Sequence, residues 1–313
     1  MNTCENSTIL EFHMVAFSTS GNTVYIIFAG FLVMYLLAVV GNLLIASLIF
    51  ATPQLHTPMY FLLCNLSIVD ATYSSAIFPN LLSFTIGMDR KITFLGCITQ
   101  LYFFIFCVDE EIFILTCMAY DRYVAVCSPL HYPMVMGKKM CIIMAAITLL
   151  LSSLNSLMFT LLTYSLSFCG PSEINHFFCE IRAIISLSNS DTSSMDMVLF
   201  IKDIFLVFFT FLFIIFSYLR IISSILKIRS SKGRFKTFSS CSSHLTSVIL
   251  FYGPILFLYM KSVSEHSADQ DKFTSLLYVV TVPVLNPFVY SLRNKEVLGA
   301  IRKVANVKWR RSW

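Results

Sequence analysis

Charged residues are scarce in this chain of 313 residues, of which only 12% are Asp, Glu, Lys or Arg. Soluble domains carry about 25% of such residues, and 57% of this sequence is hydrophobic, so the composition indicates a membrane protein. The net charge of +5 does not indicate a nucleic-acid partner. The basic residues lie in short segments between apolar runs, and no soluble domain is left to present them.

Common catalytic and metal-binding motifs are also absent. The ten cysteines include no C-x-x-C pair, which argues against a zinc ribbon or a redox pair. Neither H-E-x-x-H nor G-x-S-x-G occurs, although these motifs mark many metalloproteases and hydrolases. We therefore do not expect an enzyme. A secondary transporter remains an alternative, but neither half of the chain repeats the other, as the halves of many transporters do.

Long apolar runs are what the sequence has instead. A membrane-spanning helix needs about 20 mainly apolar residues, and seven segments approach this description. We predict an all-α membrane protein with a seven-helix bundle over 24–292, an extracellular N-terminus over 1–23 and a cytoplasmic tail over 293–313. The predicted helices cover 24–50, 58–80, 97–126, 140–162, 197–226, 238–260 and 273–292.

Basic residues predict the orientation, because cytoplasmic loops are rich in Lys and Arg. With the N-terminus outside, 16 of the 22 basic residues lie in the inner segments 122–139, 220–237 and 293–313. Only two of the 17 acids, Asp121 and Glu296, lie on that side. We therefore expect a multi-pass plasma-membrane protein whose N-terminus is outside.

The two ends carry their own signals. Asn6 begins an N-glycosylation sequon on the predicted outer side, and no cleavable signal peptide is apparent before the first span. Ile301, Val304 and Val307 recur at helical spacing in the basic tail. This spacing predicts a short amphipathic C-terminal helix on the inner leaflet, with membrane lipid as its partner.

Several ionisable residues lie inside the predicted spans, where a charge is costly and usually functional. Asp70 is in the middle of the second span, and Asp109, Glu110 and Glu111 are together in the third. Successive helical residues turn by about 100°, so these three acids cannot share one face. Lys202 lies near the outer end of the fifth span. For Glu110 and Lys202, a neutral or snorkelling side chain is an equal alternative.

Two features at the inner side are typical of a conformational switch. Asp121 and Arg122 form an adjacent acid–base pair at the end of the third span, where such a pair can hold one packing and release another. An ordinary charge pair at a helix end is the alternative. Pro283 and Pro287 interrupt the seventh span, and proline kinks a helix because it removes a backbone hydrogen bond.

Longer strings resemble one family. The sequence is similar to vertebrate odorant receptors, a group of rhodopsin-like G-protein-coupled receptors, from about 55 to 294. The matching strings are LHTPMY at Leu55–Tyr60, MAYDRYVAVC at Met118–Cys127, KTFSSCSSHL at Lys236–Leu245 and PVLNPFVYSLRN at Pro283–Asn294. Gly41-Asn42 in the first span, Asp70 in the second and Ser217-Tyr218 in the fifth follow the same pattern.

This resemblance implies a receptor that binds small, mostly hydrophobic odorants and activates the olfactory stimulatory G protein, which raises cyclic AMP. Arg122 is expected to leave Asp121 on activation and to approach Tyr218 and Tyr290, opening a cleft that His244 and the basic stretch 227–236 line. The implied G-protein coupling switch comprises Asp121, Arg122, Tyr123, Tyr218, His244 and Tyr290.

The resemblance also implies a polar cluster of Asp70, Glu111 and Asn286 in the bundle core, which holds a sodium ion or water. No other cofactor is expected. It implies a disulfide between Cys97 and Cys179, and no metal site is expected at His176–Glu180, because a disulfide-bonded cysteine is not a thiolate ligand.

The implied ligand pocket lies in the outer half of the bundle and is mostly apolar, as small-molecule sites are. Asp109 in this pocket can bind an amine, Lys202 can bind an acid, or the two can pair and favour neutral ligands. Tyr252 takes the place of an aromatic toggle below the pocket. The predicted lining residues are Phe104, Ile105, Val108, Asp109, Lys202, Leu206, Tyr252, Ile255, Leu256, Tyr259, Leu276 and Val279.

The outer loop departs from the family pattern. Cys169 usually has a partner cysteine about twenty residues later, but Asn189 stands near that place. Cys169 is therefore free, paired with Cys4, or reactive. A non-olfactory receptor of the same rhodopsin-like class also remains an alternative, since the sequence does not name the ligand.

Overall fold

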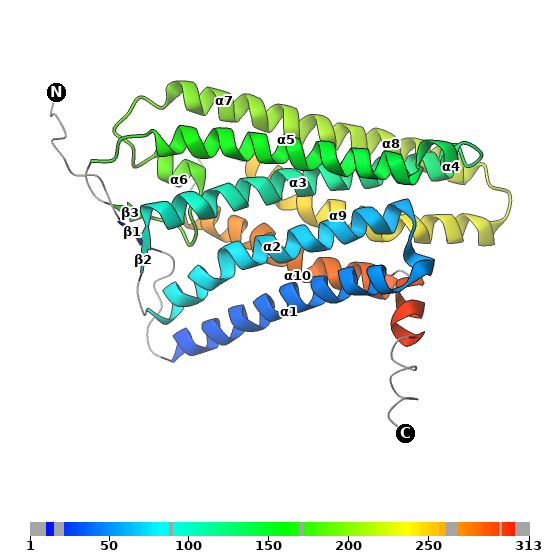
Figure 1. Cartoon of the computed structure of the whole chain (residues 1–313), viewed down its shortest axis with the longest axis horizontal. Helices are drawn as coiled ribbons and strands as arrows, with labels where there is room; N and C mark the ends of the chain where they lie inside the picture. The colour runs from blue at the N-terminus through cyan, green and yellow to red at the C-terminus, as the bar shows by residue number, and fades with distance from the viewer. Residues whose placement is uncertain are drawn as a thin grey trace.

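The computed structural model describes residues 11–15, 22–87, 90–169, 172–260, 268–293 and 296–303. Its long helices run roughly side by side along the length of the molecule (Figure 1). The shorter helical elements are η1 Pro53–Leu55, α4 Tyr132–Val135, α6 Ile181–Ile185 and η2 Ile204–Phe208. The longer helices are α1 Thr23–Ala51, α2 Pro58–Ile86, α3 Phe94–Cys127, α5 Lys138–Tyr164, α7 Ser193–Asp203, α8 Phe209–Leu226, α9 Ser231–Met260 and α10 Ala268–Arg293.

Five helices of the described chain are long and apolar enough to cross a membrane. Four correspond to α1, α2, α5 and the continuous helix Ser193–Leu226, and the fifth is the Thr274–Ser291 part of α10. α3 and α9 are 34 and 30 residues long and coincide with the third and sixth predicted spans. They are less apolar, because α3 carries three central acids and α9 begins with a basic, serine-rich stretch.

The outward faces of these helices are apolar, which is the reverse of a soluble bundle. Ile26 and Leu44 of α1 are 72% and 63% exposed, and Ile142 of α5 is 61% exposed. Polar side chains such as Asn42 and Asp70 are buried instead. A helix satisfies its own backbone hydrogen bonds, so these outward faces can contact lipid hydrocarbon.

Two irregularities shape the bundle. Pro283 and Pro287 lie inside α10, as the sequence predicts. Gly41 of α1 allows this helix to approach, because a Cβ at Gly41 would lie 3.1 Å from the Pro287 side chain. The π-helical turn η2, which the sequence analysis did not anticipate, directly follows Lys202 and Asp203. Such turns are frequent at functional sites.

A small sheet lies at the end of the bundle that the charge distribution predicts to be outside, here called the outer end. β1 Glu11–Met14 pairs antiparallel with β2 Lys91–Thr93 and parallel with β3 Glu173–Ile174. Alternate residues of a strand point to one face, and Phe12 and Met14 are both buried. The N-terminal segment, for which the sequence analysis predicted no secondary structure, therefore packs on two outer loops (Figure 1).

The chain is helical again at 296–303, beyond α10. Val297 and Ala300 are buried here, whereas Ile301 is exposed. The rest of the predicted amphipathic face lies outside the described residues, so the membrane-bound tail helix stays a prediction.

Candidate functional site

Asp121 and Arg122 pair at the inner end of α3. Nε of Arg122 lies 2.9 Å from Oδ2 of Asp121, and Nη2 of Arg122 contacts the same oxygen. Tyr132 donates its hydroxyl to the other oxygen, Oδ1, at 2.7 Å. Burial, and then the charge of Asp121, raise the pKa of Tyr132, so its hydroxyl stays protonated. Both oxygens of the Asp121 carboxylate are therefore hydrogen-bonded. The state in which Arg122 is bonded to Asp121 is called the closed state.

His244 of α9 connects three helices close to this pair. Its Nε2 lies 3.0 Å from the carbonyl oxygen of Leu115 on α3, and its Nδ1 lies 2.7 Å from the hydroxyl of Tyr218 on α8. A carbonyl oxygen only accepts, so in the neutral imidazole Nε2 carries the proton and Nδ1 accepts from Tyr218. The Tyr218 hydroxyl is thus occupied by His244 in this state.

A cleft of about 610 Å³ opens beside Arg122 at the inner end of the bundle. Lys232 and Lys236 from the predicted basic stretch line it, and Tyr60 donates to Glu296 at 2.7 Å among the lining residues. His244 does not line this cleft in the closed state, because it is fully buried between the helices and both ring nitrogens are used there. Its place in the cleft that opens on activation stays a prediction.

The other two switch residues differ in burial. Tyr123 is half-buried and packs against the core. Tyr290 of α10 is 1% exposed and belongs to the core itself. In the closed state, therefore, the switch residues are divided between the inner surface and the bundle interior.

The predicted core cluster is assembled at the centre of the bundle. Asn286 donates to Oδ2 of Asp70 at 2.9 Å and accepts from the hydroxyl of Ser247 at 3.0 Å. Asn42 donates to the carbonyl oxygen of Pro283 at 2.9 Å, so it caps a carbonyl near the proline bend. These bonds join α1, α2, α9 and α10, and neither Ser247 nor this role of Asn42 was anticipated.

Glu111 faces the same cluster from α3 and is 2% exposed. Among the described residues, its Oε1 and Oδ1 of Asp70 have no hydrogen-bond partner. Buried carboxylate oxygens normally have partners. The cluster therefore has spare acceptor capacity that a cation, a water or a proton can satisfy.

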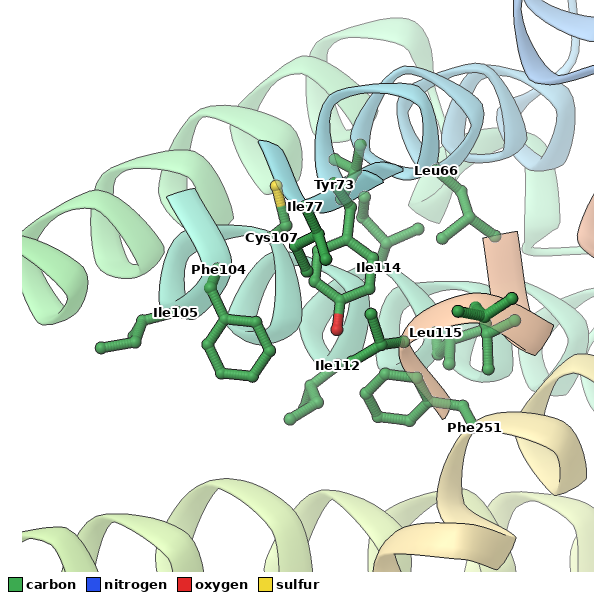
Figure 2. Packing of buried hydrophobic residues seen from close by; sticks show 14 of the residues in the cluster. Leu66, Tyr73, Ile77, Phe104, Ile105, Cys107, Ile112, Ile114, Leu115 and Phe251 are labelled. Carbon is green, nitrogen blue, oxygen red and sulfur yellow. The ribbon is translucent and has the colours of Figure 1, made fainter. Parts of the chain in front are cut away.

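The residues predicted to line the ligand pocket lie on α3, α7, η2, α9 and α10, and the pocket itself stays a prediction. Phe104, Ile105, Tyr252 and Val279 are buried in the core, while Tyr259 has its side chain outside the described residues. Figure 2 shows the ring of Phe104 extending from α3 toward the side on which Phe251 of α9 lies. The remaining apolar members are half-buried and pack against this core: Val108, Leu206, Ile255, Leu256 and Leu276.

Tyr252 lies at the meeting point of α8, α9 and η2. Its hydroxyl is 2.9 Å from the hydroxyl of Thr210, and its ring stacks on Phe211 with centroids 5.1 Å apart. The predicted toggle therefore bridges α9 to the segment that immediately follows the π-helical turn.

Asp109 and Lys202 form an ion pair, with Nζ of Lys202 3.2 Å from Oδ1 of Asp109. Asn155 of α5 donates to Oδ2 of Asp109, and Nζ of Lys202 lies 5.4 Å from the centre of the Phe159 ring. The Asp109 side chain is 1% exposed and that of Lys202 is 19% exposed. Of the three alternatives left by the sequence, mutual pairing is the one observed. Asn155 and Phe159 were not anticipated.

Glu110 points to a different helix. Thr148 and Ser152 of α5 donate to its two carboxyl oxygens at 2.9 and 2.8 Å, and Glu110 is 1% exposed. The snorkelling alternative for Glu110 is therefore wrong. Asp109, Glu110 and Glu111 have three separate sets of surroundings, as their helical spacing predicts.

The outer loop is bonded to the bundle through Cys179. Cys97 and Cys179 form the expected disulfide, with Cα atoms 5.4 Å apart, and the backbone N–H of Cys179 donates to Gln100 at 2.9 Å. Cys169 is also disulfide-bonded, so the free and reactive alternatives are wrong. Its backbone N–H donates to Asn189 at 2.8 Å. Cys4, like the sequon at Asn6, lies outside the described residues.

The sequence was compared with known proteins. A family profile described as Olfactory receptor matches residues 31–308. The chain is 45% identical over 303 residues to Olfactory receptor 5AR1 of Mus musculus, which covers 97% of this chain and 98% of that relative. It is 44% identical over 305 residues to Olfactory receptor 5AR1 of Homo sapiens, with the same coverage. The chain belongs to the olfactory receptor family.

The family membership settles the class of the protein. This olfactory receptor is a G-protein-coupled receptor and a multi-pass membrane protein, and it is not an enzyme. The transporter alternative is therefore wrong. Olfactory receptor 5B21 of Homo sapiens, 43% identical over 303 residues that cover 96% of this chain and 98% of the relative, is similar to it over the same extent.

Proposed function

We propose that this olfactory receptor crosses the plasma membrane seven times with its N-terminus outside. It binds small, mostly hydrophobic odorants in the outer half of the bundle and activates a stimulatory G protein, which raises cyclic AMP. The observation that carries this proposal is the closed Asp121–Arg122 pair beside an inner cleft of about 610 Å³. That cleft is lined with Lys232 and Lys236, on the side where basic residues concentrate.

Activation requires two exchanges of partner at the inner side. Arg122 leaves Asp121, and Tyr218 leaves His244, so that the guanidinium and the two tyrosine hydroxyls of Tyr218 and Tyr290 can meet. An odorant drives these exchanges only to the extent that it binds the active packing more tightly than the closed one. The G protein's C-terminal helix then enters the enlarged cleft.

The preferred odorants are neutral. Asp109 and Lys202 compensate each other at 3.2 Å, so neither presents a free charge to a ligand. Phe104, Ile105 and Val279, which we place in the same pocket, are apolar and buried. An amine or a carboxylate would therefore have to displace a paired buried charge, which costs several kcal/mol.

The core cluster fits a sodium ion, because Asp70 and Glu111 each present a carboxylate oxygen that lacks a hydrogen-bond partner among the described residues. When bound, the ion would supply one positive charge, which would offset part of the negative charge that Asp70 and Glu111 bring to the cluster. Asp70 also holds Asn286 of α10, so the same residue links ion binding to the proline-bent helix. We expect sodium to raise the melting temperature of the purified receptor more than equimolar N-methylglucamine does. An equal effect of both cations would exclude the ion site.

The proposal is tested by measuring cyclic AMP in cells that co-express the receptor and the olfactory G-protein α subunit, screened against a broad panel of odorants. We expect neutral hydrophobic odorants to raise cyclic AMP. The Arg122→Ala variant, at matched surface level, should lose the response completely, because it lacks the group that crosses from Asp121 to the tyrosines. An undiminished response in this variant would overturn the assigned switch.

A further inference from the structure

A second apolar site lies on the flank of the bundle, between α8 and α9. It is a groove of about 330 Å³, separate from the inner cleft. Only apolar and aromatic side chains and one glycine line it. The lining residues used below are Leu219 and Tyr218 of α8 and Ile249, Tyr252 and Gly253 of α9.

The groove opens outward. Leu219 is 61% exposed and Ile249 is 62% exposed, and these two residues come from opposite walls. A Cβ placed on Gly253 would meet no atom within 4 Å, so the glycine leaves open space on the α9 wall. The groove is continuous with the apolar outer faces of the helices, which in a membrane receptor contact lipid.

The length of the groove matches one leaflet of a bilayer. Its α8 wall covers 211–222 and its α9 wall covers 245–256. Each wall is about 16 Å long at the helical rise of about 1.5 Å per residue. The hydrocarbon core of a bilayer is about 30 Å thick, so one leaflet contributes about 15 Å. An extended hydrocarbon chain therefore fits the groove lengthwise.

We infer that this groove binds an acyl chain of a membrane lipid, from the leaflet on the Arg122 side of the bundle. This leaflet is assigned because α8 ends at Leu226, only four residues beyond the groove, and the inner cleft lies at the same end. Binding is driven by dispersion attraction, because a chain held in the groove packs more closely against the apolar walls than the mobile bulk lipid does. No charged headgroup contact is needed.

Two of the aromatic residues that line the groove, Tyr218 and Tyr252, also hold α8 to α9. The rings of Tyr218 and Tyr252 line the groove, while their hydroxyls bond to His244 and Thr210 on the inward side. The lipid chain therefore packs behind two hydrogen bonds between α8 and α9, of which the Tyr218–His244 bond must break in the proposed activation. Lipid composition is thereby coupled to the switch through contact with these two rings.

The site is tested with the purified full-length receptor in phosphatidylcholine nanodiscs that contain a phosphatidylcholine with a diazirine near the end of one acyl chain. After irradiation, mass spectrometry locates the labelled peptides. We expect labelling concentrated on 211–222 and 245–256. Gly253→Leu should lower it by about five-fold or more, equivalent to about 1 kcal/mol, because the new side chain fills the groove.

Gly30→Leu is the matched control. Gly30 is exposed on α1, and a Cβ there also meets no atom within 4 Å, so the same substitution is made on a lipid-facing helix without this groove. Leu219→Trp fills the groove from the α8 wall and replaces Gly253→Leu if that variant is not recovered, with Leu44→Trp on α1 as its control.

Even labelling of all lipid-facing helices, or an equal loss in both glycine variants, would overturn the site. The labelling needs neither an odorant nor a G protein. Failure of the lipid site therefore leaves the proposed receptor function standing, and failure of the cyclic AMP assay leaves the lipid site standing.

Discussion

The two halves of α3 use acidic residues in opposite ways. At the inner end, Asp121 is bonded to the adjacent Arg122, and that guanidinium lines a cleft. In the outer half, Asp109 and Glu110 are bonded to residues of other helices, namely Lys202, Asn155, Thr148 and Ser152. The inner pair can open without separating helices, whereas the outer bonds fix the positions of α3, α5 and α7 relative to one another.

Arg122 of the inner pair and Asp109 of the outer pair differ in burial, so the free-energy cost of breaking the two pairs also differs. Arg122 is 16% exposed and borders the cleft, so water and a partner protein can compensate its charge when it leaves Asp121. Asp109 is buried, and breaking a buried pair by removing one partner costs about 3–5 kcal/mol. This difference supports our proposal that the inner pair serves switching, while the outer pair serves assembly and ligand selection.

Substitution of Lys202 in the outer pair is expected to have the strongest effect on the receptor. Lys202→Met leaves Asp109 as an uncompensated buried charge, and we expect a loss of about 3–5 kcal/mol in stability and a strong fall in surface level. The surviving receptor should respond to amines, because Asp109 can then pair with a ligand cation. Surface immunostaining and cyclic AMP dose–response curves with neutral and amine odorants measure both effects.

The control for this variant removes both charges. Lys202→Met combined with Asp109→Asn should recover most of the surface level, because replacing a whole buried ion pair is far less costly than removing one partner. It should not respond to amines. If the double variant is as poorly expressed as the single one, loss of the cation–π contact between Lys202 and Phe159 matters more than the uncompensated charge of Asp109.

A smaller effect is expected at the inner pair. Asp121→Asn removes the negative charge that holds Arg122 but keeps an oxygen that can accept from Tyr132. We expect basal cyclic AMP to rise about five-fold, equivalent to about 1 kcal/mol in the switch equilibrium, with little change in surface level. Asp203→Asn is the control: Asp203 pairs with the exposed Arg182, and such pairs contribute about 0–1 kcal/mol. Equal basal signalling in both variants would count against the inner switch.

The sequence predicted the helices more completely than their contacts. The predicted spans 24–50 and 140–162 correspond to α1 Thr23–Ala51 and α5 Lys138–Tyr164, because a long apolar run leaves few alternatives. The strand Glu11–Met14 was missed, because it is only four residues long and its partners lie in loops far along the chain. The π-helical turn was missed because its residues, IFLVF, do not differ in composition from the helix around them.

For the site residues too, the sequence predicted some positions but not the contacts between helices. Asp121, Arg122 and Asn286 lie in distinctive strings, so their surroundings could be anticipated. Asn155 and Ser247 are ordinary polar residues in apolar helices, and only the packing of the bundle brings them to Asp109 and Asn286. Polar residues at helical spacing on α5 were the available signal, but they do not identify the helix they face.

Loss of the Tyr218 hydroxyl at the inner side is expected to have a weaker effect than loss of the Asp121 charge. Tyr218→Phe removes a hydroxyl that bonds to His244 in the closed state and, in our proposal, to Arg122 in the active state. A neutral hydrogen bond contributes about 0.5–1.5 kcal/mol, and one to a charged group about 1.5–3 kcal/mol. The active state therefore loses more, by about 1 kcal/mol. We expect lower basal cyclic AMP and a half-maximal odorant concentration raised about five-fold, at unchanged surface level.

The sign of this change separates the two roles of Tyr218. If the hydroxyl served only the closed state, its removal would free His244 from α8, and basal cyclic AMP would rise, as it does on loss of the Asp121 charge. Combining Tyr218→Phe with Asp121→Asn tests the same point. In our proposal the released Arg122 has lost one of its active-state partners, so the combined variant should signal less at rest than Asp121→Asn alone. A combined variant more active than either single one would place the Tyr218 hydroxyl with the closed state only.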